Sequence, residues 1–151
     1  MTAFPNQQIL DLADSFFDAS EILARSRANA IPILNLRCHS IELFLKSLHV
    51  NNISTDIGWG VSLIRPASGH DIRHGLRSSF ERALKEHQDE LLCDMPLLLD
   101  ELGHLEGAFQ KSRYLYEAGD SVPVSTAERV SRYLSIKISA LPLLEVDFDG
   151  P

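Results

Sequence analysis

Apolar residues recur every three or four positions along most of this chain, and no segment alternates convincingly between apolar and polar residues. Such spacing places the apolar side chains on one face of a helix. The first repeat follows Asn6, a good helix-capping residue, and continues to about Arg27. Its apolar face is formed by Ile9, Leu12, Ala13, Phe16 and Leu23. This pattern predicts an all-α protein.

Further start signals predict four more helices. Pro32 suits the opening turn of a second helix, and a capping box at 68–71 starts a third. Asp94 is expected to cap a fourth helix, and a capping box at 125–128 starts a fifth. The expected ranges are about 6–27, 32–50, 68–84, 94–116 and 125–141. Between the second and third helices we expect a long loop, with at most a short extended piece at 61–64.

The composition favours one domain. A chain of 151 residues that is 44% hydrophobic can bury one sizeable core and is too short for two. We expect that core to span about residues 6–141 and the acidic residues 142–151 to form a frayed tail. With 14 Lys and Arg against 21 Asp and Glu, the net charge of -7 disfavours non-specific binding to nucleic acid.

The sequence also favours a cytoplasmic protein that does not contact a membrane. Neither a membrane-spanning segment nor a secretion signal is visible. Cys38 and Cys93 lack the spacing of metal ligands. We therefore expect both to be buried free thiols.

The second helix carries one polar stripe on an otherwise apolar segment. Its members follow at spacings of four, three and four residues and so share one side of a helix: Asn35, His39, Glu42 and Lys46. Glu42 precedes Lys46 in the favourable orientation for a helical ion pair. The stripe is either a paired network at a helix or subunit contact, which we favour, or a nucleotide or phosphate site to which Lys46 supplies positive charge.

The expected third helix begins with a basic face. Its members fall at i, i+3, i+4 and i+7: His70, Arg73, His74 and Arg77. Asp71 is placed to cap this helix, and with His70 it is also a candidate ligand-binding residue. The face either binds an anion or is a solvated surface paired with neighbouring acids. We expect the second and third helices to lie side by side, so that the polar stripe meets this face.

The spacing of His70 and His74 also matches two zinc ligands on one helix, with Asp71 where zinc peptidases carry Glu. A third ligand is required, and no spacing favours the acids and histidine that follow: Asp100, Glu101 and His104. The two arginines of the same face would repel a divalent cation. We therefore expect no metal or other cofactor, and a zinc-dependent hydrolase is the least favoured hypothesis.

Three short motifs resemble those of the HEPN (higher eukaryotes and prokaryotes nucleotide-binding) superfamily. They are Leu36 to Lys46 in the second helix, Gly69-His70-Asp71-Ile72 at the start of the third, and Arg113-Tyr114 near the end of the fourth. The resemblance covers about residues 6–141. It implies an up-and-down bundle of four to five helices that is usually a homodimer and binds nucleotide or RNA, with Arg113 and Tyr114 among its site residues. It also implies a role in bacterial toxin-antitoxin or defence systems, or a nucleotidyltransferase or antitoxin partner.

Many active HEPN proteins are metal-independent RNases that carry an Arg, four to six intervening residues and a His. A similar pattern occurs here at Arg65 and His70, and again at Arg82 and His87. An apolar residue follows each arginine, where active relatives commonly carry a polar one. We therefore expect a homodimeric binding or assembly module, with a metal-independent endoribonuclease as the alternative.

Overall fold

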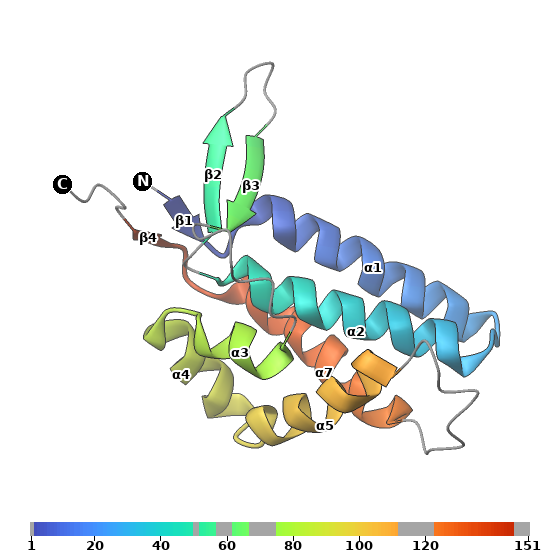
Figure 1. The fold of residues 1–151 in the computed structure, drawn as a ribbon. Helices are drawn as coiled ribbons and strands as arrows, with labels where there is room; N and C mark the ends of the chain where they lie inside the picture. The colour runs from blue at the N-terminus through green and yellow to red at the C-terminus, as the bar shows by residue number, and fades with distance from the viewer. Residues whose placement is uncertain (1, 50–51, 57–61, 67–74, 112–122, 147–151) are drawn as a thin grey trace.

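The computed structural model describes residues 2–49, 52–56, 62–66, 75–111 and 123–146. Its α-helices are α1 (Gln7–Arg25), α2 (Ala30–Ser47), α3 (Leu76–Glu81), α4 (Lys85–Asp94), α5 (Leu98–Lys111) and α7 (Val124–Lys137), and a 3-10 turn follows at Ile138–Ala140. Four short strands are β1 (Thr2–Phe4), β2 (Asn52–Asp56), β3 (Ser62–Pro66) and β4 (Leu144–Val146). The helices pack as one bundle (Figure 1), which confirms the predicted all-α fold. Among the described helices, none combines the length and the apolar character that a bilayer crossing needs.

α1 and α2 form an antiparallel pair whose helix starts follow the predicted signals (Figure 1). Asn6 caps α1, because its side-chain oxygen accepts a hydrogen bond from the backbone N–H of Ile9 at 3.2 Å. Asn29 caps α2 in the same way, with the N–H of Ile31 at 2.9 Å. Pro32 lies in the first turn of α2, where no helical hydrogen bond requires its missing N–H.

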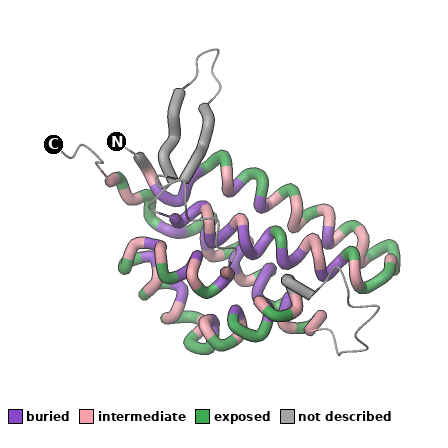
Figure 2. Tube along the Cα trace, in the orientation of Figure 1, coloured by how far each residue is buried: buried purple, intermediate pink, exposed green. Residues whose placement is uncertain are grey.

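α2 is the central helix, and it contacts α1, α3, α5 and α7. Buried residues cover most of its circumference, and Figure 2 shows the buried positions of the other helices turned toward it. The core includes Leu34, Ile41, Phe44, Phe80, Leu91, Leu102 and Leu134. Ser40 and Ser47 are also buried, but each hydroxyl donates to a carbonyl of its own helix at 2.7 and 2.6 Å. These hydrogen bonds satisfy both hydroxyl groups, so their burial leaves no donor unpaired.

The sequence does not predict the two antiparallel strand pairs. β2 pairs with β3, with Ser54 opposite Ile64, inside the segment expected to be a long loop, and Figure 1 shows this hairpin standing away from the helices. β1 pairs with β4, with Ala3 opposite Glu145, so the tail is paired rather than frayed as far as Val146. Strands of three to five residues are too short to establish an alternating pattern. β3 overlaps the short extended piece expected at 61–64, and β1 pairs with a strand at the other end of the described chain.

The expected helix at 68–84 is confirmed over Leu76–Glu81, but it ends three residues early, and a separate helix that was not expected, α4, begins at Lys85. A backbone bridge between Ala83 and His49 occupies the break. The side chain of Gln88 stabilises it by donating to the carbonyls of Glu81 and Ala83 at 3.1 and 2.8 Å. Residues 68–74 lie outside the described part of the chain.

Two predicted helix caps also need correction. Asp94 is the last residue of α4 and not the cap of the next helix. α7 begins at Val124, so Ser125 lies inside its first turn and Pro123 precedes it. The fixed φ of proline suits a chain entering a helix, and this preference places the boundary before the capping box.

Candidate functional site

The polar stripe of α2 lies at the edge of the buried surface of this helix. His39 is exposed, Asn35 is half-buried, and Glu42 is 7% exposed. The side chain of Lys46 is 33% exposed, and its Nζ donates to Oε1 of Glu42 at 2.5 Å. The predicted ion pair is therefore confirmed. It presents its cation outward and its carboxylate inward.

α3 brings a second cation to the end of this stripe. Nη1 of Arg82 lies 3.3 Å from Nε2 of His49. A guanidinium only donates, so Nε2 is the acceptor and the His49 ring carries its proton on Nδ1. The backbone bridge between His49 and Ala83 fixes the same contact from the main chain. We call Glu42, Lys46, His49 and Arg82 the α2–α3 cluster.

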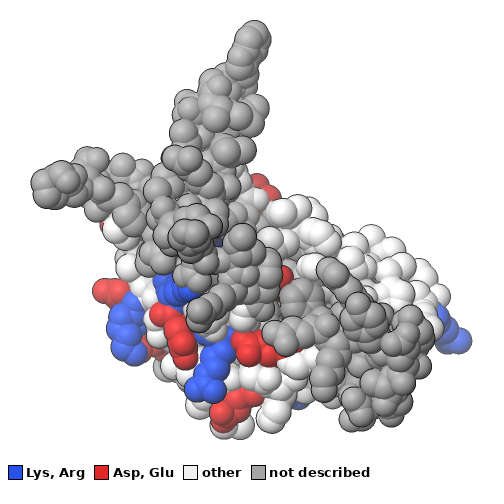
Figure 3. Space-filling view, in the orientation of Figure 1, with Lys and Arg blue, Asp and Glu red and all other residues white. Residues whose placement is uncertain are grey.

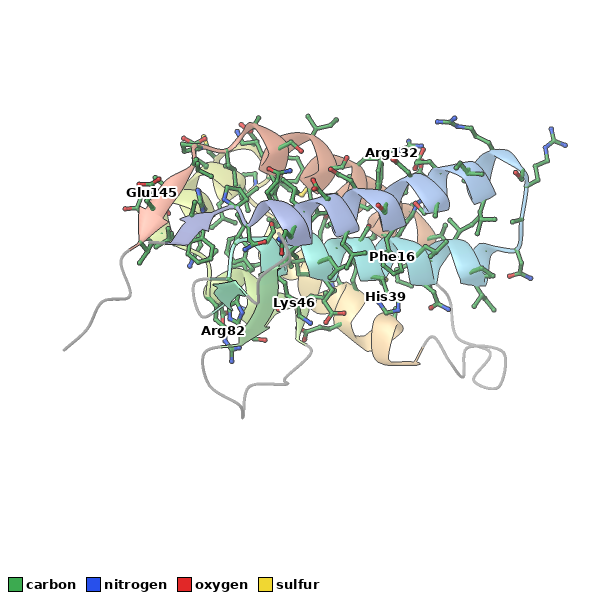
Figure 4. The ribbon with its side chains drawn as sticks, turned by 90° about the horizontal axis from the view of Figure 1, so that it is seen from above. Phe16, His39, Lys46, Arg82, Arg132 and Glu145 are labelled. Carbon is green, nitrogen blue, oxygen red and sulfur yellow. The ribbon has the colours of Figure 1, made fainter. Side chains whose placement is uncertain are left out.

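The α2–α3 cluster lies where two helices end together. Lys46 is in the last turn of α2, and Arg82 directly follows α3. Helix C-termini carry partial negative charge from their carbonyl groups, so cations here are stabilised. Figure 4 shows Lys46 and Arg82 on the same side of the molecule. α2 and α3 are in contact, which confirms that these two helices lie side by side within the described residues.

The start of α3 is positioned by α5. Gly75 precedes α3 and has no side chain to cap it, and Oε1 of Glu106 accepts the N–H of Arg77 at 2.8 Å instead. A Cβ at Gly75 would lie 2.7 Å from Oγ of Ser78 and 3.1 Å from Oε1 of Glu106. The absence of a side chain at Gly75 therefore leaves space for the Glu106 carboxylate and the Ser78 hydroxyl.

Of the predicted basic face, the structure describes Arg77. His70, Asp71, Arg73 and His74 lie outside the described residues, as do Arg113 and Tyr114. The side chain of Arg65 in β3 also lies outside the described part. Arg77 is exposed and pairs with Glu81, with Nε and Oε1 3.5 Å apart.

Arg82 and His87 do not contact each other as an RNase pair would. Arg82 contacts His49, whereas His87 is fully buried and its Nε2 lies 2.9 Å from the carbonyl oxygen of Pro142. A carbonyl only accepts, so Nε2 of His87 carries a proton. Nδ1 of His87 is buried without a hydrogen-bond partner in the described structure. His87 thus ties α4 to the segment that leads into β4.

The two histidines of the zinc hypothesis, His70 and His74, lie outside the described residues. Within the described ranges, no group of three or more His, Cys, Asp and Glu is arranged to hold a metal ion. Glu101 forms an ion pair with Arg129 of α7, while Asp100 and His104 are exposed.

The two cysteines differ in burial. Cys38 is a buried free thiol, as predicted, and burial raises its pKa to about 12. Cys93 is exposed, which corrects the prediction. Leu91 takes the inward position on α4, and a residue two places later on a helix points away.

A network of four charges between α1, α2 and α7 was not predicted from the sequence. Arg37 is 3% exposed, and its guanidinium lies 3.1 Å from Glu21 and 3.7 Å from Glu128. Arg132 closes the network at 3.0 Å from Glu21 and 2.6 Å from Glu128. The sequence signal for this network is Arg37 itself, a basic residue that lies among the buried apolar residues of α2. Figure 4 shows Arg132 on the side of the bundle opposite Lys46, so this network is separate from the α2–α3 cluster.

The network shifts the ionisation of one of its carboxyl groups. Burial raises the pKa of Glu21, but hydrogen bonds and charge from Arg132 and Arg37 outweigh burial and hold this pKa below its ordinary value. Glu21 is therefore stabilised as a carboxylate.

Arg82 and Lys46 are the residue types in the α2–α3 cluster that suit an anion. Arginine offers a fork of N–H donors that matches phosphate oxygens, and lysine adds a point charge. Comparison of the chain with models of protein families, with curated proteins and with solved structures finds no match.

Proposed function

We propose that this chain is a HEPN-like helical binding module whose α2–α3 cluster receives the phosphate of a nucleotide or of an RNA end. The observation that carries the proposal is the contact between Arg82 and His49, which brings a cation of α3 to the end of α2 beside Lys46. Nη1 of Arg82 lies 3.3 Å from Nε2 of His49, and a guanidinium is a planar fork of N–H donors of the kind that binds phosphate oxygens.

The charge of the chain favours a short ligand. A net charge of -7 repels a long polyanion, whereas the attraction of Lys46 and Arg82 acts within about 8 Å at physiological salt. A mononucleotide or a terminal phosphate is therefore attracted by Lys46 and Arg82 and is repelled only weakly by the net negative charge of the rest of the chain. Binding is preferred to RNA cleavage, because His87 is buried and engaged with Pro142.

The phosphate site predicts that an Arg82→Gln variant binds adenosine 5′-monophosphate about tenfold more weakly than the wild type, because it loses a charge-assisted hydrogen bond. Isothermal titration calorimetry measures this affinity. Arg25→Gln is the matched control, since Arg25 is an exposed arginine at the end of α1. Unchanged binding by Arg82→Gln, or no binding by the wild type, contradicts the proposal.

We further propose that two copies associate, as the HEPN resemblance implies, within a bacterial toxin-antitoxin, defence or nucleotidyltransferase-associated system. Large apolar side chains of α1 and α7 support association, because Leu12, Ile22 and Ile136 are 49%, 61% and 75% exposed. We expect size-exclusion chromatography with light scattering to give twice the mass of one chain. The mass of a single chain across all concentrations would exclude the homodimer.

A further inference from the structure

α1 presents a ridge of apolar and small side chains on the side turned away from the core. Its members follow one another at spacings of three, four and three residues: Leu12, Ser15, Ala19 and Ile22. Leu12 and Ile22 are 49% and 61% exposed, whereas Leu10 of the same helix is buried. Helices that pack against one another as coiled coils carry apolar residues at this spacing. We call these four residues the α1 ridge.

The α1 ridge is symmetric about residue 17, because a large side chain stands at each end and two small ones stand in the middle. An antiparallel copy of α1 would place Leu12 against Ile22 and Ser15 against Ala19, and twofold symmetry repeats both contacts. The small central residues allow the two helices to approach closely. The hydroxyl of Ser15 donates to the carbonyl of Asp11 at 2.9 Å, so its burial leaves no donor unpaired. The ridge is therefore complementary to itself.

The charges beside the α1 ridge favour the same antiparallel arrangement. Asp11, Asp18 and Arg25 follow one another along one flank at intervals of seven residues. None of these three forms an ion pair within the described part of the chain. Burial, and then the charges of Asp18 and Asp11, raise the pKa of Asp14, so like charges repel one another in this half of the helix. Figure 3 shows little charge over α1 and α2 between acidic atoms near the start of α1 and basic atoms where α1 passes into α2.

We propose that two copies of this chain associate through the α1 ridge, with their α1 helices antiparallel and Arg25 of each copy beside Asp11 of the other. This inference rests on the homodimer of the proposed function and assigns its interface. A parallel pair would instead bring each Asp11 beside its own copy, and the like charges would oppose it. α1 contributes no residue to the α2–α3 cluster, so association and nucleotide binding can be measured separately.

Cysteine cross-linking tests the orientation of the two helices. One variant carries Leu12→Cys and another carries Ile22→Cys, each with the exposed Cys93 replaced by Ser. The two positions are about 15 Å apart along α1, whereas a disulfide joins Cα atoms about 4.4–6.8 Å apart. On mild oxidation we expect a disulfide-linked dimer when the two variants are mixed and none from either variant alone. Leu97→Cys mixed with Ile22→Cys is the control, because Leu97 is 64% exposed and lies outside α1.

A charge-reversal series tests the flanking contact by light scattering across a range of concentrations. Arg25→Glu should weaken association about tenfold, because it turns two attractions across the interface into repulsions. Adding Asp11→Arg to Arg25→Glu should restore association. Asp18→Asn should strengthen association, since the two copies of Asp18 meet near the twofold axis. Lys85→Glu changes the net charge as Arg25→Glu does and should have no effect, because Lys85 is 72% exposed and lies in α4.

The possible outcomes separate the interface from the homodimer itself. A cross-link of either cysteine variant with itself, or in the Leu97 control, overturns the antiparallel α1 pair. A dimer that forms without a cross-link in the mixture, or that the double charge reversal does not restore, overturns this interface and leaves the homodimer standing. A wild type with the mass of one chain at every concentration overturns both.

Discussion

Replacing Glu21 by Gln should lower the free energy of unfolding by about 3 kcal/mol at neutral pH. Arg37 is 3% exposed and lies 3.1 Å from Glu21, while its second acidic neighbour, Glu128, is farther away at 3.7 Å. Gln keeps the shape of the side chain but removes the charge, so a buried guanidinium loses its principal counter-ion. Urea unfolding measures the loss.

Two further variants separate the buried charge from other effects of substitution. Glu86→Gln is the matched control, because Glu86 is an exposed carboxylate and its loss should cost well under 1 kcal/mol. Glu21→Leu combined with Arg37→Met should be less destabilising than Glu21→Gln alone, since no unpaired buried charge remains. A loss as small as that of Glu86→Gln would show that Arg37 does not depend on Glu21.

The same network sets a pH dependence with a definite sign. Because the pKa of Glu21 is lowered in the folded protein, its stabilising contribution is complete above the ordinary value of 4.5 and is lost as the pH falls through the lowered pKa. The difference in stability between the wild type and Glu21→Gln should therefore shrink below pH 4.5. A difference that stays constant down to acid unfolding would contradict this assignment.

Replacing Phe80 by Ala should destabilise the protein by about 3–5 kcal/mol and abolish nucleotide binding as well. Phe80 is 1% exposed and belongs to the core, and it is carried by α3, a helix of only six residues. A helix of that length is not stable without tertiary packing. Loss of the Phe80 ring therefore releases α3 and withdraws Arg82 from His49.

Urea unfolding and titration with adenosine 5′-monophosphate measure the two effects of Phe80→Ala. Phe80→Leu, which retains most of the apolar volume, should cost less and preserve binding. Leu97→Ala is a surface control, because Leu97 is 64% exposed. Binding that survives Phe80→Ala unchanged would show that α3 does not contribute to the site.

The features that could be predicted from the sequence are contacts between residues of one helix that lie three or four positions apart. The cap at Asn6 and the pairing of Glu42 with Lys46 involve residues three or four positions apart, where helical geometry determines the contact. The break after α3 could not be predicted, because it depends on a bridge between Ala83 and His49. Contacts of that kind depend on how the helices pack, and the spacing of apolar residues within one helix does not determine them.

The same limit applies to the candidate site. The polar stripe of α2 was predictable from spacing alone, but its cationic partner Arg82 lies 33 positions from His49. The buried Arg37 was missed for a similar reason, since Glu21 lies 16 positions before it in another helix. The spacing of the stripe located the candidate site on α2, whereas the packing of α3 against α2 determined which cation joins it.

The cap that Glu106 provides has a mechanical consequence. α3 is held at its first turn by a carboxylate of α5 and is followed directly by Arg82, and its six residues span about 9 Å. Loss of the Glu106 carboxylate would therefore loosen the first turn of α3 and, through so short a helix, the contact of Arg82 with His49.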